Sequence, residues 1–279
     1  MVTTFALKTV YAGSFKTSYL EAGNPANPTV VLIHDGGFGT SAELCWGRVI
    51  PQLAEEYHVL APELLGWGGT DKAVFLDRPP YEPRVQQIAD FCSALDITEA
   101  HFVGASFGGS VLLRALCAPN RPWPVKRAVS ISGTGGPYRL SEGIAALADF
   151  EPSVEAAERM TGLIVRSTEG MEDHIQKRYE NSLIPGHWEA MTAPRLRNPS
   201  VQLKLPPDPY LDQLTEMTTP VLLVEGRYDT LLEQGWSQKL AALSPAIEAI
   251  EMDFSHEPNI DAPRETSQVI WEFLRKEKA

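Results

Sequence analysis

The sequence is poor in cysteine and has no long apolar run. Its three cysteines, Cys45, Cys92 and Cys117, cannot all pair with one another, and none has the C-x-x-C spacing that is typical of metal sites. They are expected to be buried apolar side chains of a protein in a reducing compartment. No segment approaches the ~18 apolar residues that cross a bilayer, and the N-terminus lacks the apolar centre of a signal peptide. We therefore expect a cytoplasmic protein without a membrane partner.

Positive charge is also scarce. The 279 residues include 24 Lys and Arg against 36 Asp and Glu, which gives a formal net charge of -12. Such a surface repels phosphate backbones, and basic residues cluster only in the last few positions, so nucleic acid is not an expected partner. The sequence also has no P-loop, no dinucleotide-binding fingerprint and no metal-ligand cluster, which predicts a protein without cofactor or metal.

Apolar, β-branched runs alternate with helical patterns along most of the chain. An opening hairpin, Thr3–Tyr11 with Lys16–Glu21, precedes six further strand-like runs: Thr29–Ile33, His58–Ala61, Ala100–Val103, Val125–Ser132, Pro220–Val224 and Ile247–Met252. Helical patterns cover Ser41–Glu56, Pro83–Leu95, Ser106–Ala118, Gln234–Leu243 and Ala262–Lys276. This alternation predicts an α/β fold with a mostly parallel eight-stranded sheet flanked by helices.

The alternation fails between Gly135 and about Leu211. Four short helical patterns occupy this stretch: Ser141–Phe150, Val154–Val165, Glu172–Leu183 and Trp188–Met191. We divide the chain into a core, residues 1–135 and 212–279, and a helical insertion, residues 136–211. An insertion after the sixth strand is expected to form a lid over the carboxyl ends of the strands, where such sheets bind ligands. The alternative is a segment that only stabilises the fold.

The strongest local signal is the sequence Gly104-Ala105-Ser106-Phe107-Gly108. It follows a strand-like run and precedes a helical pattern, which is the context that the G-x-S-x-G motif requires. The tight turn raises the Ser106 hydroxyl above the sheet, at a helix N-terminus where N–H groups stabilise developing negative charge. Gly104 and Gly108 are needed because a side chain at either position would collide with the turn. Ser106 is thus a candidate nucleophile, against the alternative of a glycine turn without chemistry.

A serine nucleophile needs a base, and that base needs a carboxylate. Of the six histidines, His256 follows the last strand-like run and is the one expected to reach Ser106. Asp229 follows the neighbouring run Pro220–Val224 and is the candidate carboxylate. The alternative for Asp229 is a turn residue that caps the next helix.

A glycine-rich loop, His34-Asp35-Gly36-Gly37-Phe38-Gly39, follows the third strand-like run. Its Gly36 N–H and the N–H of Phe107 are candidate donors of an oxyanion hole. Four residues are candidates for an apolar substrate pocket, although aromatic residues at such positions are as often plain packing: Gly37, Phe38, Trp67 and Trp188.

These features together resemble the α/β-hydrolase superfamily over essentially the whole chain. The chain order Ser106, Asp229, His256 is the order of that superfamily, and Pro62–Asp71 is similar to its D-x-x-G-x-G-x-S-D stretch. The resemblance implies the α/β-hydrolase fold. Within the superfamily, the nucleophile segment and residues 46–50 look most like the meta-cleavage-product hydrolases, which split a carbon–carbon bond in vinylogous diketo acids. Related branches are esterases, including hydrolases of aromatic monoesters such as monoalkyl phthalates.

The sequence departs from the meta-cleavage pattern at three places. Asp35 replaces the glycine after the loop histidine, and Ala105 replaces an asparagine before the nucleophile. Around the base, Ser255-His256-Glu257 replaces the usual G-H-W. Gly36 keeps the backbone donor. We expect the Asp35 carboxylate to point away from the oxyanion pocket and to accept hydrogen bonds from its own loop, because a charge aimed at an oxyanion would oppose catalysis.

We therefore predict a serine hydrolase that cleaves a small carboxylic ester through an acyl-enzyme, because Ala105 removes a polar group typical of the carbon–carbon enzymes. The alternatives are carbon–carbon hydrolysis by the same residues and a ligand receptor without catalysis. Assembly is left open, with a homodimer as one possibility. Both candidate substrates, aromatic monoesters and diketo acids, carry a carboxylate, for which an arginine of the insertion would be a partner. The candidates are Arg139, Arg159, Arg166, Arg178, Arg195 and Arg197.

Overall fold

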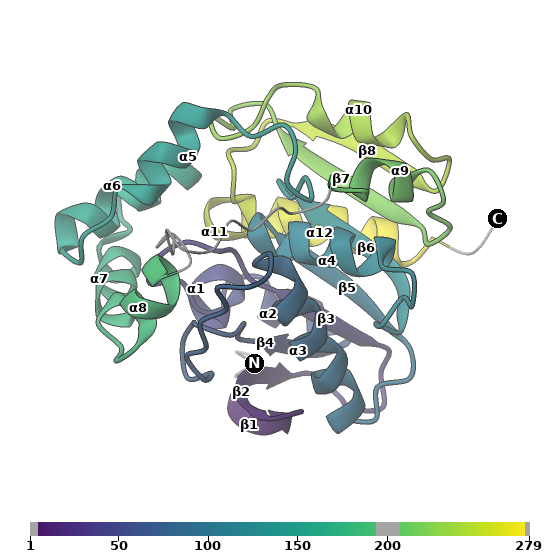
Figure 1. Ribbon diagram of the computed structural model, residues 1–279, viewed down its shortest axis with the longest axis horizontal. Coiled ribbons are helices and arrows are strands. Elements are labelled where there is room, and N and C mark those ends of the chain that lie inside the picture. Colours follow the sequence, from purple (N-terminus) through teal and green to yellow (C-terminus); the bar gives the residue numbers. More distant parts are fainter. Residues whose placement is uncertain (1–4, 194–206, 277–279) are drawn as a thin grey trace.

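The computed structural model describes residues 5–193 and 207–276, which form one sheet with helices on both faces (Figure 1). The strands are β1 (Ala6–Ala12), β2 (Phe15–Ala22), β3 (Thr29–Ile33), β4 (His58–Pro62), β5 (Ala100–Ala105), β6 (Val125–Ile131), β7 (Val221–Gly226) and β8 (Ile247–Met252). Their order is β1-β2-β4-β3-β5-β6-β7-β8. Pairing is antiparallel for β1 with β2 and β2 with β4, and parallel from β4 through β8. The predicted eight-stranded, mostly parallel sheet is confirmed.

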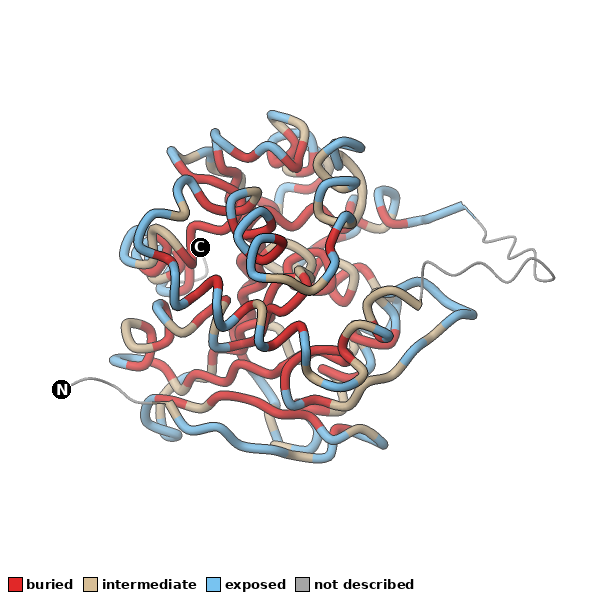
Figure 2. Tube along the Cα trace, turned by 90° about the vertical axis from the view of Figure 1, so that its left-hand side faces the viewer, coloured by how far each residue is buried: buried red, intermediate tan, exposed pale blue. Residues whose placement is uncertain are grey.

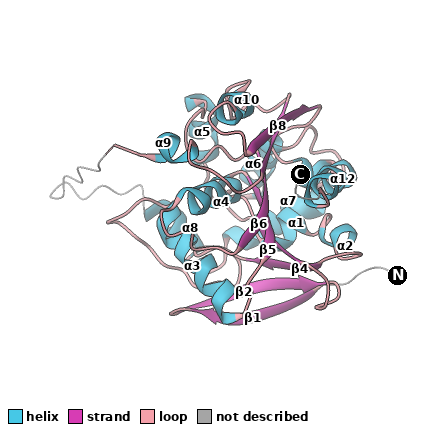
Figure 3. Cartoon of the chain, turned by 90° about the vertical axis from the view of Figure 1, so that its right-hand side faces the viewer, coloured by secondary structure: helices cyan, strands magenta, loops and turns pink. Residues whose placement is uncertain are grey.

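The helices cover the two faces of the sheet as separate layers (Figure 3). One layer holds α3 (Tyr81–Ala94), α4 (Phe107–Cys117) and α10 (Trp236–Ala241), and the other holds α1 (Ala42–Trp46), α2 (Ile50–Leu53) and α12 (Pro263–Leu274). Every residue of β5 and β7 is buried, as expected for strands covered on both faces. Figure 2 shows buried residues gathered in the middle of the molecule and exposed residues around its outside. Among the described residues, no helix has the length and apolar character to cross a membrane.

The single helix predicted over Ser41–Glu56 is wrong, because this segment forms α1 and α2 as two short helices. Ser41 caps α1, its Oγ accepting a hydrogen bond from Leu44 N at 3.2 Å. Pro51 lies in the first turn of α2. A proline has no N–H to donate, and its ring collides with the carbonyl four residues earlier, so one continuous helix cannot pass through it.

The segment between β6 and β7 is helical, as expected. It contains α5 (Ser141–Ala148), α6 (Val154–Ile164), α7 (Glu172–Ser182) and α8 (His187–Thr192), followed by α9 (Tyr210–Leu214), which the sequence patterns did not suggest. In Figure 1 helices α5 to α8 stand together beside the sheet. They have their own apolar cluster, in which Phe150, Met160 and Ile175 pack with Phe38 of the core. The predicted domain boundaries stay a prediction, and residues 194–206 lie outside the described part of the chain.

Candidate active site

Ser106 lies in the turn between β5 and α4, where its backbone adopts φ 51°. Side chains rarely adopt such angles, and they persist only where the surrounding structure holds them. The turn is tight, because a Cβ at Gly108 would lie 2.3 Å from His34 O, and one at Gly104 would lie 2.5 Å from Gly109 N. The glycines therefore allow β5, α4 and the loop after β3 to meet at Ser106.

Replacing Gly108 by alanine is expected to destabilise the fold. The added methyl group would meet backbone carbonyls, which cannot move aside, and overpacking of this kind costs about 1–3 kcal/mol. Gly162→Ala is the control, because the same group in α6 would find Thr168 at 3.8 Å and a helical alanine gains about 0.5–1 kcal/mol over glycine. Urea unfolding of both variants measures the difference. Equal stability of the two variants would contradict this account of the turn.

His256 bridges the two other predicted catalytic residues. It lies in the loop between β8 and α11 (Pro258–Asp261), and its Nε2 is 2.8 Å from Ser106 Oγ. Its Nδ1 is 2.7 Å from Asp229 Oδ2, in the loop after β7. The structure thus brings together three side chains from the carboxyl ends of three strands, although they are far apart in the sequence.

Asp229 is buried but held in its ionised form. Burial by itself raises the pKa of this carboxyl group, but the charge interaction and hydrogen bond with His256 and the hydrogen bond from Leu231 N outweigh it and lower the pKa. The Leu231 N–H donates to Asp229 Oδ1 at 2.8 Å, so each carboxylate oxygen has a fixed partner. A fixed, ionised carboxylate at Nδ1 leaves Nε2 as the nitrogen that can accept a proton from Ser106.

The two predicted oxyanion donors lie against each other. A Cβ built on Gly36 would be 2.7 Å from the Phe107 Cβ, and both residues line the cavity that contains Ser106. Phe107 is the first residue of α4, and the first N–H groups of a helix have no acceptor within it. The backbone at both positions can therefore face an oxygen bound near Ser106.

Ser106 and His256 open into a cavity of about 430 Å³ between the sheet and the helical insertion. Three of the four predicted pocket residues, Gly37, Phe38 and Trp67, line it, and Trp67 Nε1 donates to Gly37 O at 2.9 Å. Trp188 is not among the lining residues. Its ring packs behind the wall, 5.4 Å from Phe38, because α8 turns this side towards the apolar cluster of the insertion. Phe38 also stacks on Phe150 at 4.8 Å.

Two of the six candidate arginines line this cavity, Arg139 and Arg178. Arg178, on α7, is completely buried, and Nη1 donates to Phe38 O at 3.1 Å, while Nε and Nη2 have no partner among the described residues. Arg159 is exposed on α6 and Arg166 lines a separate surface groove. Arg195 and Arg197 lie outside the described residues.

Asp35 accepts hydrogen bonds from its own loop, as predicted. Gly37 N donates to Oδ1 at 2.7 Å and Thr40 Oγ1 donates to Oδ2 at 2.5 Å. Asp35 is nevertheless one of the residues that line the cavity. The same loop is held by His34, whose buried Nε2 accepts a hydrogen bond from Leu64 N at 2.9 Å.

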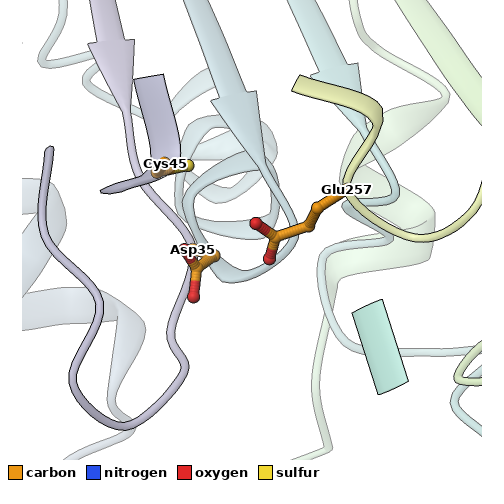
Figure 4. Close-up of side chains that lie close together, drawn as sticks. All are labelled: Asp35, Cys45 and Glu257. Carbon is orange, nitrogen blue, oxygen red and sulfur yellow. The ribbon is translucent and has the colours of Figure 1, made fainter. Parts of the chain in front are cut away.

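Glu257 is the functional-site residue that sequence reasoning missed as a member of the cavity. Figure 4 shows its carboxyl group directed towards Asp35, with Cys45 beside them, and polar atoms of the three lie within 4.8 Å of one another. The charge of Arg178 acts on this cluster, and both Asp35 oxygens already accept hydrogen bonds, so the arrangement does not favour a metal ion. The available signal was the position of Glu257, directly after the catalytic base.

Comparisons with known proteins agree with this geometry. Residues 30–269 match the model of the Alpha/beta hydrolase family. The chain is 30% identical over 240 residues to 2-hydroxy-6-oxononadienedioate/2-hydroxy-6-oxononatrienedioate hydrolase of Paraburkholderia xenovorans, covering 82% of this chain and 80% of the relative. It is 32% identical over 196 residues to 2-hydroxy-6-oxo-2,4-heptadienoate hydrolase of Pseudomonas putida, covering 67% and 68%.

Solved structures show the same fold. That of 2-hydroxy-6-oxo-6-phenylhexa-2,4-dienoate hydrolase from Rhodococcus sp. strain RHA1 matches with a TM-score of 0.83 and 25% identity, covering 98% of this chain and 100% of the other. The carboxylesterase CesB from Bacillus subtilis matches with a TM-score of 0.80 and 19% identity, covering 99% and 93%, a likeness of fold alone. The resemblance seen in the sequence motifs is therefore confirmed.

Proposed function

This chain belongs to the alpha/beta hydrolase family, and on that premise we propose that it is a serine hydrolase that cleaves a small carboxylic ester through an acyl-enzyme. The observation that carries the proposal is the position of His256, hydrogen-bonded to Ser106 at 2.8 Å and to Asp229 at 2.7 Å. A receptor that only binds a ligand does not need a serine, a histidine and an aspartate in this arrangement.

In the first half of the reaction, Ser106 Oγ attacks the ester carbonyl carbon while His256 Nε2 accepts the hydroxyl proton. The carbonyl oxygen becomes an oxyanion, which the N–H groups of Gly36 and Phe107 stabilise. Asp229 stabilises the positive charge that His256 then carries. Collapse of the tetrahedral intermediate breaks the ester bond, and His256 returns the proton to the departing alcohol.

In the second half, water takes the place of the alcohol. His256 Nε2 accepts a proton from water, whose oxygen attacks the acyl-enzyme carbonyl. The same two N–H groups stabilise the second oxyanion, and Ser106 leaves with the proton that His256 holds. The acid product and the starting enzyme result.

Carbon–carbon hydrolysis of a vinylogous diketo acid is the second candidate. The names of the relatives in Paraburkholderia xenovorans and Pseudomonas putida support it. Against it stands Ala105, which is fully buried at the end of β5 and offers no polar side chain beside the nucleophile. Departure of a carbon group requires protonation of an enolate, for which a polar group near Ser106 would be useful.

A direct test compares both substrate classes. A p-nitrophenyl ester should give a burst of nitrophenol and an acyl adduct on Ser106 detectable by mass spectrometry. A 2-hydroxy-6-oxo-dienoate, followed by loss of its absorbance, should react more slowly. Faster turnover of the dienoate would favour the second candidate, and absence of turnover and adduct with both substrates would leave the receptor.

We further propose that the helical insertion is a lid and that its Arg178 binds a substrate carboxylate. A buried guanidinium with two unpartnered nitrogens lacks the compensation that buried charges need, and a carboxylate would supply it. The net charge of -12 gives no long-range attraction for an anion, so selectivity must arise within the cavity.

Arg178→Gln is expected to lower kcat/KM for a carboxylate-bearing ester by about 10- to 100-fold, the worth of hydrogen bonds to a charged group. The neutral methyl ester of the same substrate should lose much less. Arg159→Gln is the control, since its side chain is exposed on α6. Circular dichroism establishes that the Gln variant is folded, and equal losses on both esters would remove the anion-binding role.

A further inference from the structure

Glu257 takes no part in the catalytic steps proposed above. It is 1% exposed, lines the cavity with Ser106, and its Oε2 has no hydrogen-bond partner among the described residues. A buried, ionised carboxylate with an unpartnered oxygen would be unfavourable. The structure therefore requires either a compensating ligand or a proton on this side chain.

The neighbouring Asp35 decides which carboxyl group carries the proton. Both Asp35 oxygens accept hydrogen bonds, from Gly37 N at 2.7 Å and Thr40 Oγ1 at 2.5 Å, and such bonds favour the ionised form. Two carboxyl groups with oxygens within 4.8 Å of each other cannot easily both be ionised in a buried site (Figure 4). Asp35 is thus the anion of the pair and Glu257 the acid.

The groups that surround Glu257 support this assignment. Burial raises the pKa of Glu257 well above its usual value, the Asp35 and Asp229 charges raise it further, and Arg178 and Asn259 only partly oppose this. Cys45 on α1, beside both carboxyl groups, is a buried thiol whose pKa burial raises. His174 on α7, which interacts with Arg178 and Asp35, is neutral, because burial lowers its pKa to about 4. The negative charge of Asp35 then offsets the positive charge of Arg178.

A neutral Glu257 and a charged Arg178 both present unused hydrogen-bonding groups to one cavity. Arg178 has free N–H groups at Nε and Nη2, and the Glu257 acid can offer its O–H. A carboxylate is the substrate group that accepts both kinds of donor. If Glu257 lost its proton, the cavity would gain a second carboxylate charge and an anionic substrate would be repelled.

We propose that Glu257 acts as a carboxylic acid that determines specificity, donating a hydrogen bond to the substrate carboxylate beside Arg178, and that its ionisation excludes anionic substrates. This inference rests on the proposed function, because it concerns the same cavity and substrate class. It makes recognition of an anion depend on pH, with binding favoured on the acid side of the Glu257 ionisation.

Binding of two small probes separates this inference from the catalytic proposal, because binding requires no turnover. Benzoate and its neutral analogue benzamide are titrated calorimetrically into the wild type and into Glu257→Gln, from acid to alkaline pH. The glutamine amide donates hydrogen bonds but cannot ionise. Over this range, the benzoate affinity of the wild type should fall at least about tenfold more than that of the Gln variant, while benzamide should show no such difference.

Two additional variants sharpen the test. Asp35→Asn removes the neighbouring charge, so the loss of benzoate binding should move to lower pH. Glu158→Gln, an exposed position on α6, should behave as the wild type. Infrared spectroscopy gives a readout without ligand: the wild type should show a protonated carboxyl band that disappears at alkaline pH and is absent in Glu257→Gln.

The outcomes are distinct. Parallel pH dependence of benzoate binding in the wild type and Glu257→Gln, or a wild type without the protonated carboxyl band, overturns the inference even if esters are hydrolysed. Conversely, benzoate binding that follows Glu257 in a protein that cleaves no ester supports the inference and contradicts the ester hydrolase.

Discussion

Ser106→Ala should lower kcat on an ester by about 10⁶, the cost of removing a triad nucleophile. The expectation follows from the proposed path, in which every bond made to the substrate carbonyl in the first half is made by Ser106 Oγ. His256 cannot replace it, because its Nε2 faces the serine and its Nδ1 faces Asp229. Binding should survive, since the cavity wall and Arg178 are unchanged.

The measurement is single-turnover and steady-state hydrolysis of a p-nitrophenyl ester by purified protein. Ser110→Ala is a matched control, because Ser110 also lines the cavity from α4 but its Oγ accepts a hydrogen bond from Gly135 N at 3.1 Å and does not contact His256. The control should keep most of the activity. An alanine variant at 106 within tenfold of the wild type would remove Ser106 from its role.

The sheet was predictable because the local sequence of each strand is sufficient to identify it. Runs such as those of β5 and β7 are continuous and apolar, which suits only a strand covered on both faces, and the structure buries every residue of both. The prediction of one helix over residues 41–56 was wrong because the apolar spacing continues through Pro51, which fits the first turn of a helix but not its interior. Apolar periodicity shows which face of a helix is buried. The point at which a helix ends can instead depend on one residue, here a proline without a backbone N–H donor.

The arrangement of Ser106, Asp229 and His256 was predictable for a topological reason. Residues that follow parallel strands of one sheet lie at the same edge of it, so chain order and strand ends suffice to place them together. The residues that line the cavity cannot be predicted from chain order and strand ends. Trp188 and Arg178 both belong to the insertion, and which of them reaches the cavity depends on how α7 and α8 pack on Phe38. Helical spacing alone does not contain that information.

The role of Glu257 could not be predicted from the sequence either. Its position after the base was visible in the sequence, but its role depends on Asp35, which is far away in the sequence. A lone glutamate after His256 indicates an ordinary charged side chain. The pairing of two buried carboxyl groups, one with satisfied oxygens and one without, is a property of the folded chain only.

The second large effect is expected at Asp229. Asp229→Asn should lower kcat by about 10⁴ with little change in stability, because the amide can donate to His256 Nδ1 and so favours the tautomer with the proton on Nε2. In that tautomer His256 cannot accept the Ser106 proton. The hydrogen bond from Leu231 N to Oδ1 can be kept by the amide oxygen, so the loop geometry should persist.

Asp253→Asn is the control for this prediction. It lies in the loop that carries His256, but its carboxylate pairs with Arg227 at the surface, so its removal should leave kcat nearly unchanged. Proton NMR provides a second readout: the wild type should show a strongly deshielded Nδ1–H signal from the 2.7 Å bond between His256 and Asp229, and the Asn variant should lose it. If Asp229→Asn retains that signal or loses less than tenfold in kcat, another carboxylate holds His256. The loss is expected to be smaller than that of Ser106→Ala, because an imidazole in the wrong tautomer can still change tautomer, whereas a missing nucleophile cannot be replaced.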